Sequence, residues 1–513
     1  MSAEPWSEAM IGIFTGARIK ELDRYTIEHE PVSSIDLVER AAATWVYEFE
    51  RLYTQQRRIV VFAGPGNNGA DALCAARILG ENGYSVDAFL FNVSGSLSPE
   101  CNECRVRLLE TSGIRLTEVV DNFIPPELSS QAVVVDGLFG VGLNRPLQGG
   151  FAKVVEFLNQ SGAEIVSIDI PSGLFEEDNF GNNPNAIIRA THTLTFEYPK
   201  LSFLFSENAD YVGKWKVLNI GLSVEGKQTI KTEYFLNTDF DISGIIRQRP
   251  RFAHKGTFGH ALLIAGSRGK MGAACLAAKA CLRSGIGLLT THIPACGEAV
   301  MQTAVPEAMV HADEKTDIVC DYSSPLVFQA VGIGPGIGRA EGTVLLVEKI
   351  LSTPNGPLVL DADALNIIAE NRSWLDRLPI NSILTPHSRE LERLTTHCNT
   401  DYERLRQARF LACHHHVYVV LKGAFSATCM PGGMVVFNNT GNPGMATGGS
   451  GDVLMGIITG LLGSGYLPAS ACVLGNYIHG LAGDIYAGRY SQESLIASDI
   501  IDNLGTAFRQ VRD

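Results

Sequence analysis

The feature that most constrains the fold is a repeated order of apolar run, glycine-rich turn and amphipathic segment. This order is typical of βα units around parallel sheets and predicts an α/β fold class. The first half predicts strands at Arg58–Ala63, Ser85–Phe91, Ala132–Asp136, Ile165–Ile170 and Thr191–Phe196, and helices at Ala70–Gly83, Glu100–Thr111 and Ala152–Gln160. The second half predicts strands at Ala261–Ala265, Leu288–Ile293, Ala330–Ile333, Leu358–Leu360, Ser382–Leu384 and Val417–Leu421, and helices at Ala273–Ser284, Thr343–Leu351 and Val453–Leu462.

The chain has 513 residues, which is more than one hydrophobic core normally supports, so we expect two domains. The polar stretch Val224–Lys231 and the arginine-rich segment Ile245–His254 indicate the joint, and a new strand–turn–helix unit begins at His260. We place the boundary near residue 235, which gives domains 1–235 and 236–513. Because each half carries its own glycine-rich site, the sequence indicates a fusion and not a repeat.

Charge and cysteine content exclude several classes of protein. Acidic residues outnumber basic ones by 55 to 41, and no Lys/Arg cluster forms the basic face of a nucleic-acid binder. The 11 cysteines are scattered, and Cys101 and Cys104 form a CxxC without a second pair at zinc spacing, so we expect reduced, structural thiols. The first ten residues do not read as a secretory signal, and no apolar stretch approaches the roughly 20 residues that span a bilayer. We therefore expect a cytoplasmic homo-oligomer without a membrane or nucleic-acid partner.

Three consecutive histidines, His414, His415 and His416, raise the question of a metal site. Adjacent residues at a helix end or in a strand cannot all face one ion. Short histidine tracts are compositional signals only, so the sequence favours a structural role.

The first glycine-rich site follows the strand Arg58–Ala63 directly. The segment Gly64–Asp71 opens a helix, and a helix start of this kind presents free N–H groups and a positive dipole end to a phosphate. A tight βα turn that needs glycine for positive φ is the alternative interpretation.

Polar side chains also follow the next strands of this half. Asp136 ends one strand, Asp169 ends another, and Ser172 follows shortly after. The carboxyl ends of parallel strands meet at one edge of a sheet, where α/β proteins bind ligands. Asn68, Asp136 and Ser172 offer only oxygen ligands, which suit an alkali or hard cation, and Asp169 is a candidate acid/base. Each aspartate alone is equally well explained as a helix cap or turn residue.

The first half resembles the NAD(P)H-hydrate epimerase family. The resemblance rests on the segments Asp36–Ala41, Gly64–Asp71, Asp136–Pro146 and Asp169–Gly173. It implies a Rossmann-like three-layer α/β/α domain with K⁺ on Asn68, Asp136 and Ser172. It also implies a hydrate site formed by Asn67, Asn68, Gly69, Ala70, Asp71, Gly140, Val141, Gly142, Leu143, Asn144, Arg145, Pro146 and Asp169. Inverting C6 of the hydrate requires its hydroxyl to leave or the ring to open, helped by proton transfer from a carboxylate such as Asp169.

This half departs from the family pattern at one turn. The family usually has glycines on both sides of the aspartate, whereas this chain has Ala70 and Ala72 around Asp71. Because alanine adopts positive φ only at a cost, we expect Ala70 to lower epimerase efficiency and Ala72 to sit harmlessly within the helix.

The second glycine-rich site carries the strongest signal in the chain. Gly449-Ser450-Gly451-Asp452 precedes a predicted helix, which combines backbone amides for a transferring phosphoryl group with a carboxylate for the reacting hydroxyl. A glycine turn with Asp452 as an ordinary carboxylate at a helix N-terminus is the alternative.

Gly449–Asp452 resembles the ribokinase-like kinases. The wider set His254–Gly259, Gly334–Gly338, Leu384–His387, Lys422–Ala424 and Asn442–Asp452 is similar to the ADP/ATP-dependent NAD(P)H-hydrate dehydratases. With the first half, the resemblance spans nearly the whole chain, in the order found in fused bacterial repair enzymes. It implies that Asp452 is catalytic and that the hydrate contacts Ala273, Gly334, Gly336, His387 and Asp452. It implies nucleotide contacts from Lys422, Gly423, Ala424, Phe425, Ser426, Gly449 and Gly451.

The implied function is repair of the hydrated cofactors NADHX and NADPHX. One domain epimerises the R and S forms, and the other phosphorylates the S form so that phosphate leaves and NAD(P)H is restored. ADP or ATP, bound with Mg²⁺, would be converted to AMP or ADP. Asp361 and Glu390 are candidate outer-shell helpers. The family usually continues Pro-Gly-Glu after His387, whereas this chain has Ser388-Arg389-Glu390, which we expect to shift His387.

Two alternative functions remain open from the sequence. One is a ribokinase-like kinase of a hydroxymethylpyrimidine-type alcohol fused to a Rossmann-like module, which Gly449–Asp452 alone does not exclude. The segments His254–Gly259 and Asn442–Thr447 favour the dehydratase over it. The other is a non-catalytic scaffold such as the eukaryotic mRNA-decapping enhancers, because fold alone does not imply chemistry. Retention of Asn68, Asp136 and Asp169 favours an active site over a scaffold.

Overall fold

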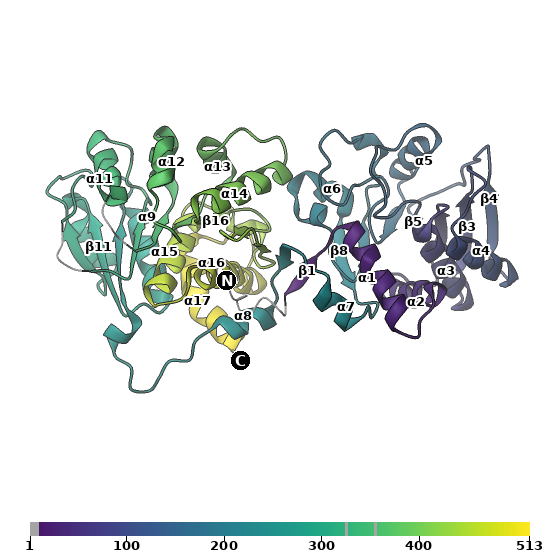
Figure 1. Ribbon diagram of the computed structural model, residues 1–513, viewed down its shortest axis with the longest axis horizontal. Helices are drawn as coiled ribbons and strands as arrows, with labels where there is room; N and C mark the ends of the chain where they lie inside the picture. Colours follow the sequence, from purple (N-terminus) through teal and green to yellow (C-terminus); the bar gives the residue numbers. More distant parts are fainter. Residues whose placement is uncertain (1–9, 324–326, 353–355, 513) are drawn as a thin grey trace. The chain divides into compact units, whose positions relative to one another are not determined.

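The computed structural model describes residues 10–323, 327–352 and 356–512. They divide into two compact units, one formed by Gly12–Thr232 and the other by the described residues before and after it (Figure 1). The first nine residues, which bear on the expectation of no secretory signal, lie outside the described part. In the described part, no helix is both long and apolar enough to cross a bilayer. The assignment of one activity to each side of residue 235 stays a prediction.

The first unit is built around a parallel sheet of seven strands. Every neighbouring pair runs parallel. In spatial order the strands are β4 (Arg115–Val119), β3 (Ser85–Phe91), β2 (Arg58–Ala63), β5 (Ala132–Gly137), β6 (Glu164–Ile168), β7 (His192–Phe196) and β8 (Lys214–Leu218). This is the doubly wound order, which reverses between β2 and β5, and ligands bind at such a reversal point.

Helices cover both faces of this sheet. They are α1 (Gly16–His29), α2 (Ser34–Leu52), α3 (Asn67–Glu81), α4 (Pro99–Glu110), α5 (Gly149–Gln160), α6 (Ala209–Val212) and α7 (Val224–Thr229), with 3₁₀ turns η2 (Pro184–Ala186), η3 (Leu201–Leu204) and η4 (Ser206–Asn208). Alternate residues of β2 enter two separate cores: Val61 lies in the core with α2 to α4, and Val60 in the core with α5. The fold is therefore the three-layer α/β/α arrangement that the sequence predicts.

The second unit contains a larger, mixed sheet. In spatial order its strands are β12 (Met309–Ala312), β11 (Leu288–Ile293), β10 (His260–Ile264), β13 (Ala330–Ile333), β14 (Leu358–Leu360), β15 (Ile383–Leu384), β16 (Tyr418–Leu421), β17 (Ala427–Cys429), β18 (Val435–Phe437) and β9 (Tyr234–Leu236). The strands from β12 to β16 run parallel, whereas β17 is antiparallel to both its neighbours. The strand order reverses between β10 and β13, which makes this reversal point the equivalent of the one in the first unit. The short strand β1 (Ile11–Ile13) stands where the chain divides.

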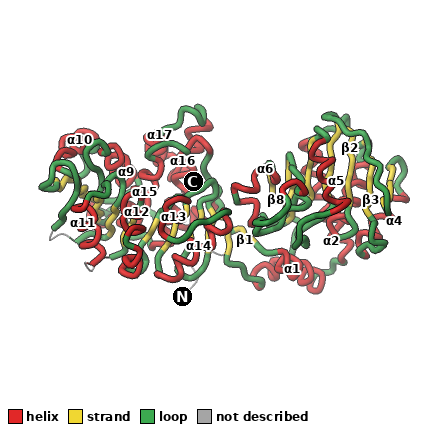
Figure 2. The backbone as a smooth tube through the Cα atoms, turned by 90° about the horizontal axis from the view of Figure 1, so that it is seen from above, coloured by secondary structure: helices red, strands yellow, loops and turns green. Residues whose placement is uncertain are grey.

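The helices of the second unit pack on this sheet. They are α8 (Asp239–Ile245), α9 (Met271–Arg283), α10 (Glu298–Ala304), α11 (Glu341–Ser352), α12 (Ala362–Glu370), α13 (Ser388–Leu394), α14 (Asp401–His415), α15 (Ser450–Gly463), α16 (Pro468–Arg489) and α17 (Ala497–Arg512), with 3₁₀ turns η5 (Lys255–Phe258), η6 (Ala295–Gly297), η7 (Arg372–Arg377) and η8 (Pro443–Met445). Helices α9 and α15 lie side by side (Figures 1 and 2). A Cβ at Gly456 would stand 2.2 Å from the carbonyl oxygen of Ala277, and one at Gly460 would stand 2.5 Å from that of Cys281. Glycine is therefore required for this contact.

The structure corrects several predicted elements. Residues 224–231, interpreted as part of a joint, largely form helix α7 (Val224–Thr229), whose Gly226 packs against Leu22 and Tyr25 of α1. Helix α3 begins at Asn67 and helix α15 at Ser450, each three residues before its predicted start, so both glycine motifs extend into a first helical turn. Strand β6 ends at Ile168, because Asp169 takes a positive φ of 65° that no strand residue adopts.

Candidate active sites

A cavity of about 990 Å³ opens at the reversal point of the first sheet. Ten of the residues predicted from the family resemblance line it: Asn67, Asn68, Asp71, Gly140, Val141, Gly142, Leu143, Asn144, Arg145 and Asp169. The predicted residues Gly69, Ala70 and Pro146 are not among its lining residues. The loops after β2 and β5 therefore meet at one site, as the strand order requires.

The start of α3 lies at this cavity, where the sequence predicts phosphate binding. Ala70 N–H bonds to the carbonyl of Gly66, the N-cap, so the amides of Asn67, Asn68 and Gly69 precede the first intrahelical bond. A Cβ at Gly69 would lie 1.8 Å from the carbonyl oxygen of Gly64, so this glycine permits a close backbone approach. Ala70 is buried on the helix and does not have a positive φ, so the backbone cost expected there is absent.

Asn68, Asp136 and Ser172, predicted to hold K⁺, come together around the carbonyl of Phe139, and Asn68 also lines the cavity. The buried Asp136 carboxylate accepts bonds from Ser172 Oγ at 2.6 Å, Ser172 N at 2.9 Å and Ser167 Oγ at 2.8 Å. Asn68 Nδ2 donates to the Phe139 carbonyl at 3.1 Å, and Ser172 Oγ lies 3.2 Å from the same carbonyl. Burial raises the pKa of Asp136 despite these bonds. Its hydrogen-bonded partners in the described residues are neutral, and the nearby oxygens are hard ligands, so the set fits a monovalent cation.

Asp169 sits in the cavity wall with a left-handed backbone. Its Oδ1 accepts bonds from Lys200 Nζ at 2.7 Å, Thr195 Oγ1 at 3.0 Å and the amide of Phe196 at 3.0 Å. These three bonds fix the carboxylate through one oxygen, and a strained φ held by its surroundings is typical of functional residues. Lys200 is only 1% exposed, which makes this a buried ion pair.

Two more carboxyl groups of the cavity lie in unusual electrostatic surroundings. Burial, followed by the charge of Asp169, raises the pKa of Asp71 well above its usual range. The same two causes raise the pKa of Asp23, on α1, to about 6. Sequence reasoning named Asp71 only as a binding residue and missed Asp23 and Lys200. Lys200 was detectable, because it follows the predicted strand Thr191–Phe196 at the ligand-binding edge of the sheet, whereas α1 itself was not predicted.

The second site begins at the N-terminus of α15. Gly449, the N-cap, has a φ of 91°, and a Cβ there would stand 2.5 Å from Leu276 of α9. His479 Nε2 lies 3.0 Å from the Ser450 carbonyl oxygen and 3.3 Å from its hydroxyl, and burial lowers the pKa of His479 to about 4. The neutral imidazole of His479 therefore contacts Ser450, the first residue of α15. Gly451 and Asp452 follow in the same first helical turn.

Charged side chains gather around Gly451 and Asp452. Lys422 Nζ lies 2.7 Å from Asp361 Oδ1 and 4.0 Å from Glu390 Oε2. A Cβ on Gly451 would approach Lys422 Nζ to 3.3 Å, which places this lysine against the start of α15. Burial, followed by the charge of Asp361, raises the pKa of Asp452 to about 6, and Lys422 opposes this shift. Asp452 is thus a carboxyl group that changes protonation state near neutrality.

The predicted loop Gly334–Gly338 borders the same site. A Cβ on Gly334 would stand 1.8 Å from the Asp361 carbonyl oxygen, and one on Gly336 would stand 3.2 Å from Ala273 Cβ. Asp363 accepts a bond from the Gly338 amide at 2.9 Å and also contributes to the raised pKa of Asp452. The predicted hydrate residues of α9 and of the loop after β13 are therefore neighbours, and Asp363 links this loop to Asp452 on α15.

His387 is held more firmly than the sequence suggests. It is the N-cap of α13, where its Nδ1 accepts bonds from the amides of Arg389 at 3.1 Å and Glu390 at 3.4 Å. Glu390 Oε2 accepts a bond from the His387 amide at 2.9 Å, which completes a capping box. This cap holds His387 without a Pro-Gly turn. The predicted nucleotide residues Gly423, Ala424, Phe425 and Ser426 form the hairpin loop between β16 and β17, which follows Lys422.

Comparisons with known proteins match both halves of the chain. A family model described as YjeF-related protein N-terminus matches residues 34–202, and one described as NAD(P)H-hydrate dehydratase matches residues 261–505. The bifunctional NAD(P)H-hydrate repair enzyme Nnr of Moorella thermoacetica is 34% identical over 522 residues, covering 98% of this chain and 97% of the relative. The chain belongs to the family of bifunctional NAD(P)H-hydrate repair enzymes.

Other repair enzymes of this family match along most of their length. Nnr of Thermofilum pendens is 35% identical, covering 97% of this chain and 96% of the relative. Nnr of Escherichia coli is 32% identical, covering 88% of this chain and 85% of the relative. Among solved structures, the ADP/ATP-dependent NAD(P)H-hydrate dehydratase of Bacillus subtilis, co-crystallized with ATP/Mg²⁺, is 29% identical with a TM-score of 0.47. It covers 53% of this chain and 97% of its own length.

Proposed function

We propose that the first unit interconverts the R and S forms of NADHX and NADPHX, and that the second dehydrates the S form to NAD(P)H. The second reaction would use ADP or ATP and release AMP or ADP with phosphate. The observation that carries the proposal is the same arrangement in each unit: a glycine-rich helix start and a carboxyl group meet at the reversal point of a parallel sheet. Both units lie in one chain that the repair-enzyme family covers almost completely.

In the epimerase unit, two carboxyl groups of the cavity, Asp71 and Asp169, are placed to give and accept the proton. Burial raises the pKa of Asp71 and so favours its protonated form, the form that can protonate the departing C6 hydroxyl. Water leaves as the lone pair of the adjacent ring nitrogen forms a C=N bond, and water returns on the opposite face. Asp169, fixed by Lys200, accepts the proton of the incoming water. The amides at the start of α3 bind the hydrate's phosphates.

K⁺ would be held by Asp136, Ser172, Asn68 and the carbonyl of Phe139. When bound, it supplies the positive charge that the buried Asp136 carboxylate lacks, and it fixes the loop after β5. The same loop carries Gly140 and Arg145 into the cavity, so the cation site supports the substrate site.

In the dehydratase unit, Asp452 accepts the proton of the C6 hydroxyl, and the hydroxyl oxygen attacks the terminal phosphoryl group of the nucleotide. The amides at the start of α15 and the Lys422 ammonium stabilise the charge on that group. The C–O bond of the new phosphoester then breaks with the help of the ring nitrogen. Loss of a proton from C5 gives the C5=C6 double bond of the dihydronicotinamide, so phosphate is the other product.

Mg²⁺ accompanies nucleotide phosphates and is commonly bound through one or two carboxylates. Asp361 and Glu390 offer oxygen ligands beside Lys422, so the residues present fit this ion. When bound, Mg²⁺ neutralises charge on the phosphates, while Lys422 is drawn from Asp361 toward the nucleotide.

The decisive experiment separates the two reactions. Purified protein receives a mixture of R and S NADPHX with Mg²⁺ and either ADP or ATP, and the absorbance of regenerated NADPH is followed. Wild type consumes both epimers, Asp169→Asn consumes only S, and Asp452→Asn restores no NADPH although it still equilibrates R and S. The exposed Asp317→Asn serves as the matched control and behaves as wild type. Release of a stable phosphoester without NADPH contradicts the dehydratase assignment and favours a kinase.

Cytoplasmic location and a homo-oligomeric state stay predictions. Fractionation of cells with an antibody to the chain tests the first, and light scattering behind a size-exclusion column tests the second.

A further inference from the structure

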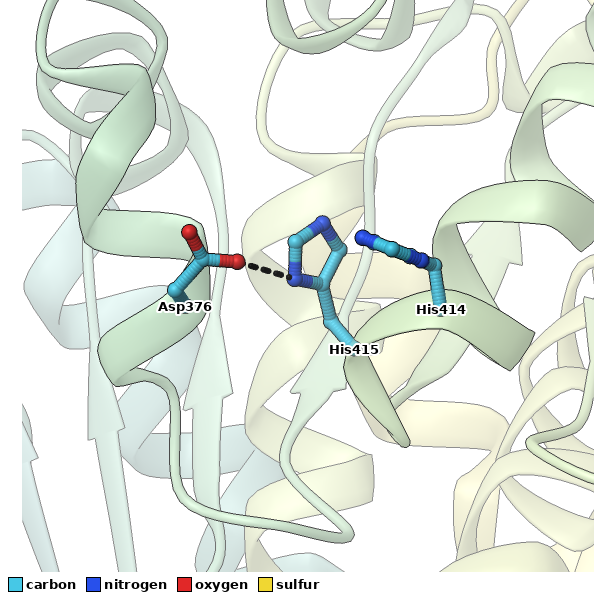
Figure 3. A group of neighbouring side chains, drawn as sticks. All are labelled: Asp376, His414 and His415. Atoms are coloured by element: carbon cyan, nitrogen blue, oxygen red, sulfur yellow. Dashed lines mark ion pairs between the residues drawn. The ribbon is translucent and has the colours of Figure 1, made fainter.

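A cluster of metal-ligating side chains lies in the second unit, on residues that neither proposed reaction uses. Asp376 belongs to the 3₁₀ turn η7, and His414 and His415 are the last two residues of α14 (Figure 3). The ligand atoms of the three side chains all lie within 4.8 Å of one another. Figure 3 shows the His415 ring between the Asp376 carboxylate and the His414 ring.

One of the three ligand pairs already has the separation that a small tetrahedral ion requires. Bonds of about 2.0–2.2 Å at tetrahedral angles place neighbouring ligand atoms about 3.3–3.5 Å apart. His415 Nδ1 lies 3.2 Å from Asp376 Oδ1, so this pair already has the required separation. His414 must move closer to the other two ligands. Its side chain is exposed and makes ring contacts with Phe410, at 5.3 Å between centroids, and with His415, at 4.7 Å, which it would have to give up on binding the ion.

The backbone explains why two of the three consecutive histidines converge. His416 is the C-cap of α14 and turns out of the helix with a left-handed φ of 54°. His414 and His415 remain in the last helical turn and meet Asp376 from η7. The sequence favours a structural role because three adjacent histidines cannot all face one ion. That argument does not cover a site formed by only two of them. The carbonyl end of a helix also favours a cation.

The surroundings leave room for an ion and a water ligand. A shallow cavity of about 410 Å³ is lined by all three side chains, together with Thr395 and Gln407. Arg372 also lines it, and its guanidinium donates to the carbonyl of Arg393 at 2.8 Å.

We propose that Asp376, His414 and His415 form a binding site for a divalent transition-metal ion of the zinc class. Two imidazoles and one carboxylate select borderline ions such as Zn²⁺, Co²⁺ or Ni²⁺ over Mg²⁺, which prefers oxygen ligands. Water completes the coordination. The bound ion joins η7 to the end of α14 and thereby stabilises this side of the second unit. This site shares no residue with the Mg²⁺–nucleotide site around Asp361 and Lys422, so it stands or falls independently of the proposed repair reactions.

The test uses the full chain without a polyhistidine tag, freed of metal by a chelator and kept free of nucleotide. Titration with Co²⁺ is followed by visible absorption, and titration with Zn²⁺ by calorimetry. We expect one ion per chain and a tetrahedral Co²⁺ spectrum. Asp376→Asn and His414→Gln each weaken binding by at least about tenfold, the lower end of the loss caused by removing an outer-shell partner. Both side chains are exposed, so these variants are expected to fold.

The chain offers a matched control. His397 Nδ1 lies 3.2 Å from Glu392 Oε2, the same distance as in the His415–Asp376 pair, and His397 is 79% exposed. No second histidine joins that pair among the described metal-ligating groups. His397→Gln therefore leaves the affinity unchanged, and Zn²⁺ raises the melting temperature of this control but not of Asp376→Asn. Equal binding by wild type and Asp376→Asn, or an equal loss in the control, overturns the proposal and identifies unspecific surface binding only.

Discussion

The pH dependence of the dehydratase reaction is the sharpest consequence of the second site. In the proposed reaction Asp452 must be ionised to accept the hydroxyl proton, and burial together with Asp361 raises its pKa from 3.8 to about 6. Lowering the pH therefore protonates the group and removes the base, so activity falls on the acid side. The ionised fraction drops from about nine-tenths at about pH 7 to about one-tenth at about pH 5, which predicts about a tenfold loss of kcat/KM. A carboxyl group with an ordinary pKa would stay about nine-tenths ionised over the same interval.

A substitution at Asp361 tests the cause of this shift. Asp361→Asn removes the charge that helps to raise the pKa of Asp452 and frees Lys422, which lowers it. Both effects shift the acid side of the pH profile of kcat/KM to lower pH. This shift is expected whatever the change in maximal rate. The assay measures initial rates of NADPH formation from S-NADPHX at fixed ionic strength, with substrate well below KM. An acid limb that stays in place in Asp361→Asn, or a wild-type rate that is flat down to about pH 5, refutes the reasoning.

Three further perturbations follow from the structure. Lys200→Met leaves Asp169 with an unpaired buried charge and should lower the free energy of unfolding of the first unit by about 3 kcal/mol, measured by urea titration. K⁺ should raise the melting temperature of the wild type more than Na⁺ does, and this difference should vanish in Asp136→Asn, measured by differential scanning fluorimetry. Gly456→Ala should destabilise the second unit by about 1–3 kcal/mol and reduce dehydratase activity, because its methyl group meets the Ala277 carbonyl.

Each of these expectations has a clear contrary result. An unchanged urea midpoint in Lys200→Met would mean that water or another group neutralises Asp169. Equal effects of K⁺ and Na⁺ would remove the reason for a selective cation site. A stable Gly456→Ala variant would show that α15 can move away from α9 without loss.

The parts of the fold that sequence predicts well are those with local signals. Strands β2, β3, β11, β13 and β14 have the predicted bounds. Strands β2, β13 and β14 are short, mostly apolar runs whose residues are almost all buried, which is the pattern that sequence predicts best. The edge strand β4 was not predicted, since most of its residues are exposed and its hydrophobic pattern is weak. The hairpin strands β17 and β18 have three residues each, too few to show a period.

The candidate sites divide in the same way. Glycine motifs and strand-end aspartates were visible because they stand beside the turns that position them. The pairing of Lys422 with Asp361 joins residues 61 positions apart, and the pKa of Asp71 depends on burial that only the folded chain creates. The convergence of Asp376 with His414 and His415 likewise depends on how η7 meets α14, which no local pattern reports.

The contact between α9 and α15 bears on how this enzyme can change over time. Ala273 stands in the first turn of one helix and Asp452 in the first turn of the other, while Gly456 and Gly460 bring the two backbones together farther along. The separation between Ala273 and Asp452 is thus set by the direct backbone contact of the two helices and not by loops. Lineages can lengthen or shorten the surface loops and adapt to new substrates, yet any side chain at either glycine would push Asp452, the proposed base, away from Ala273. Selection at these two positions should therefore persist even where the residues that touch the substrate have diverged.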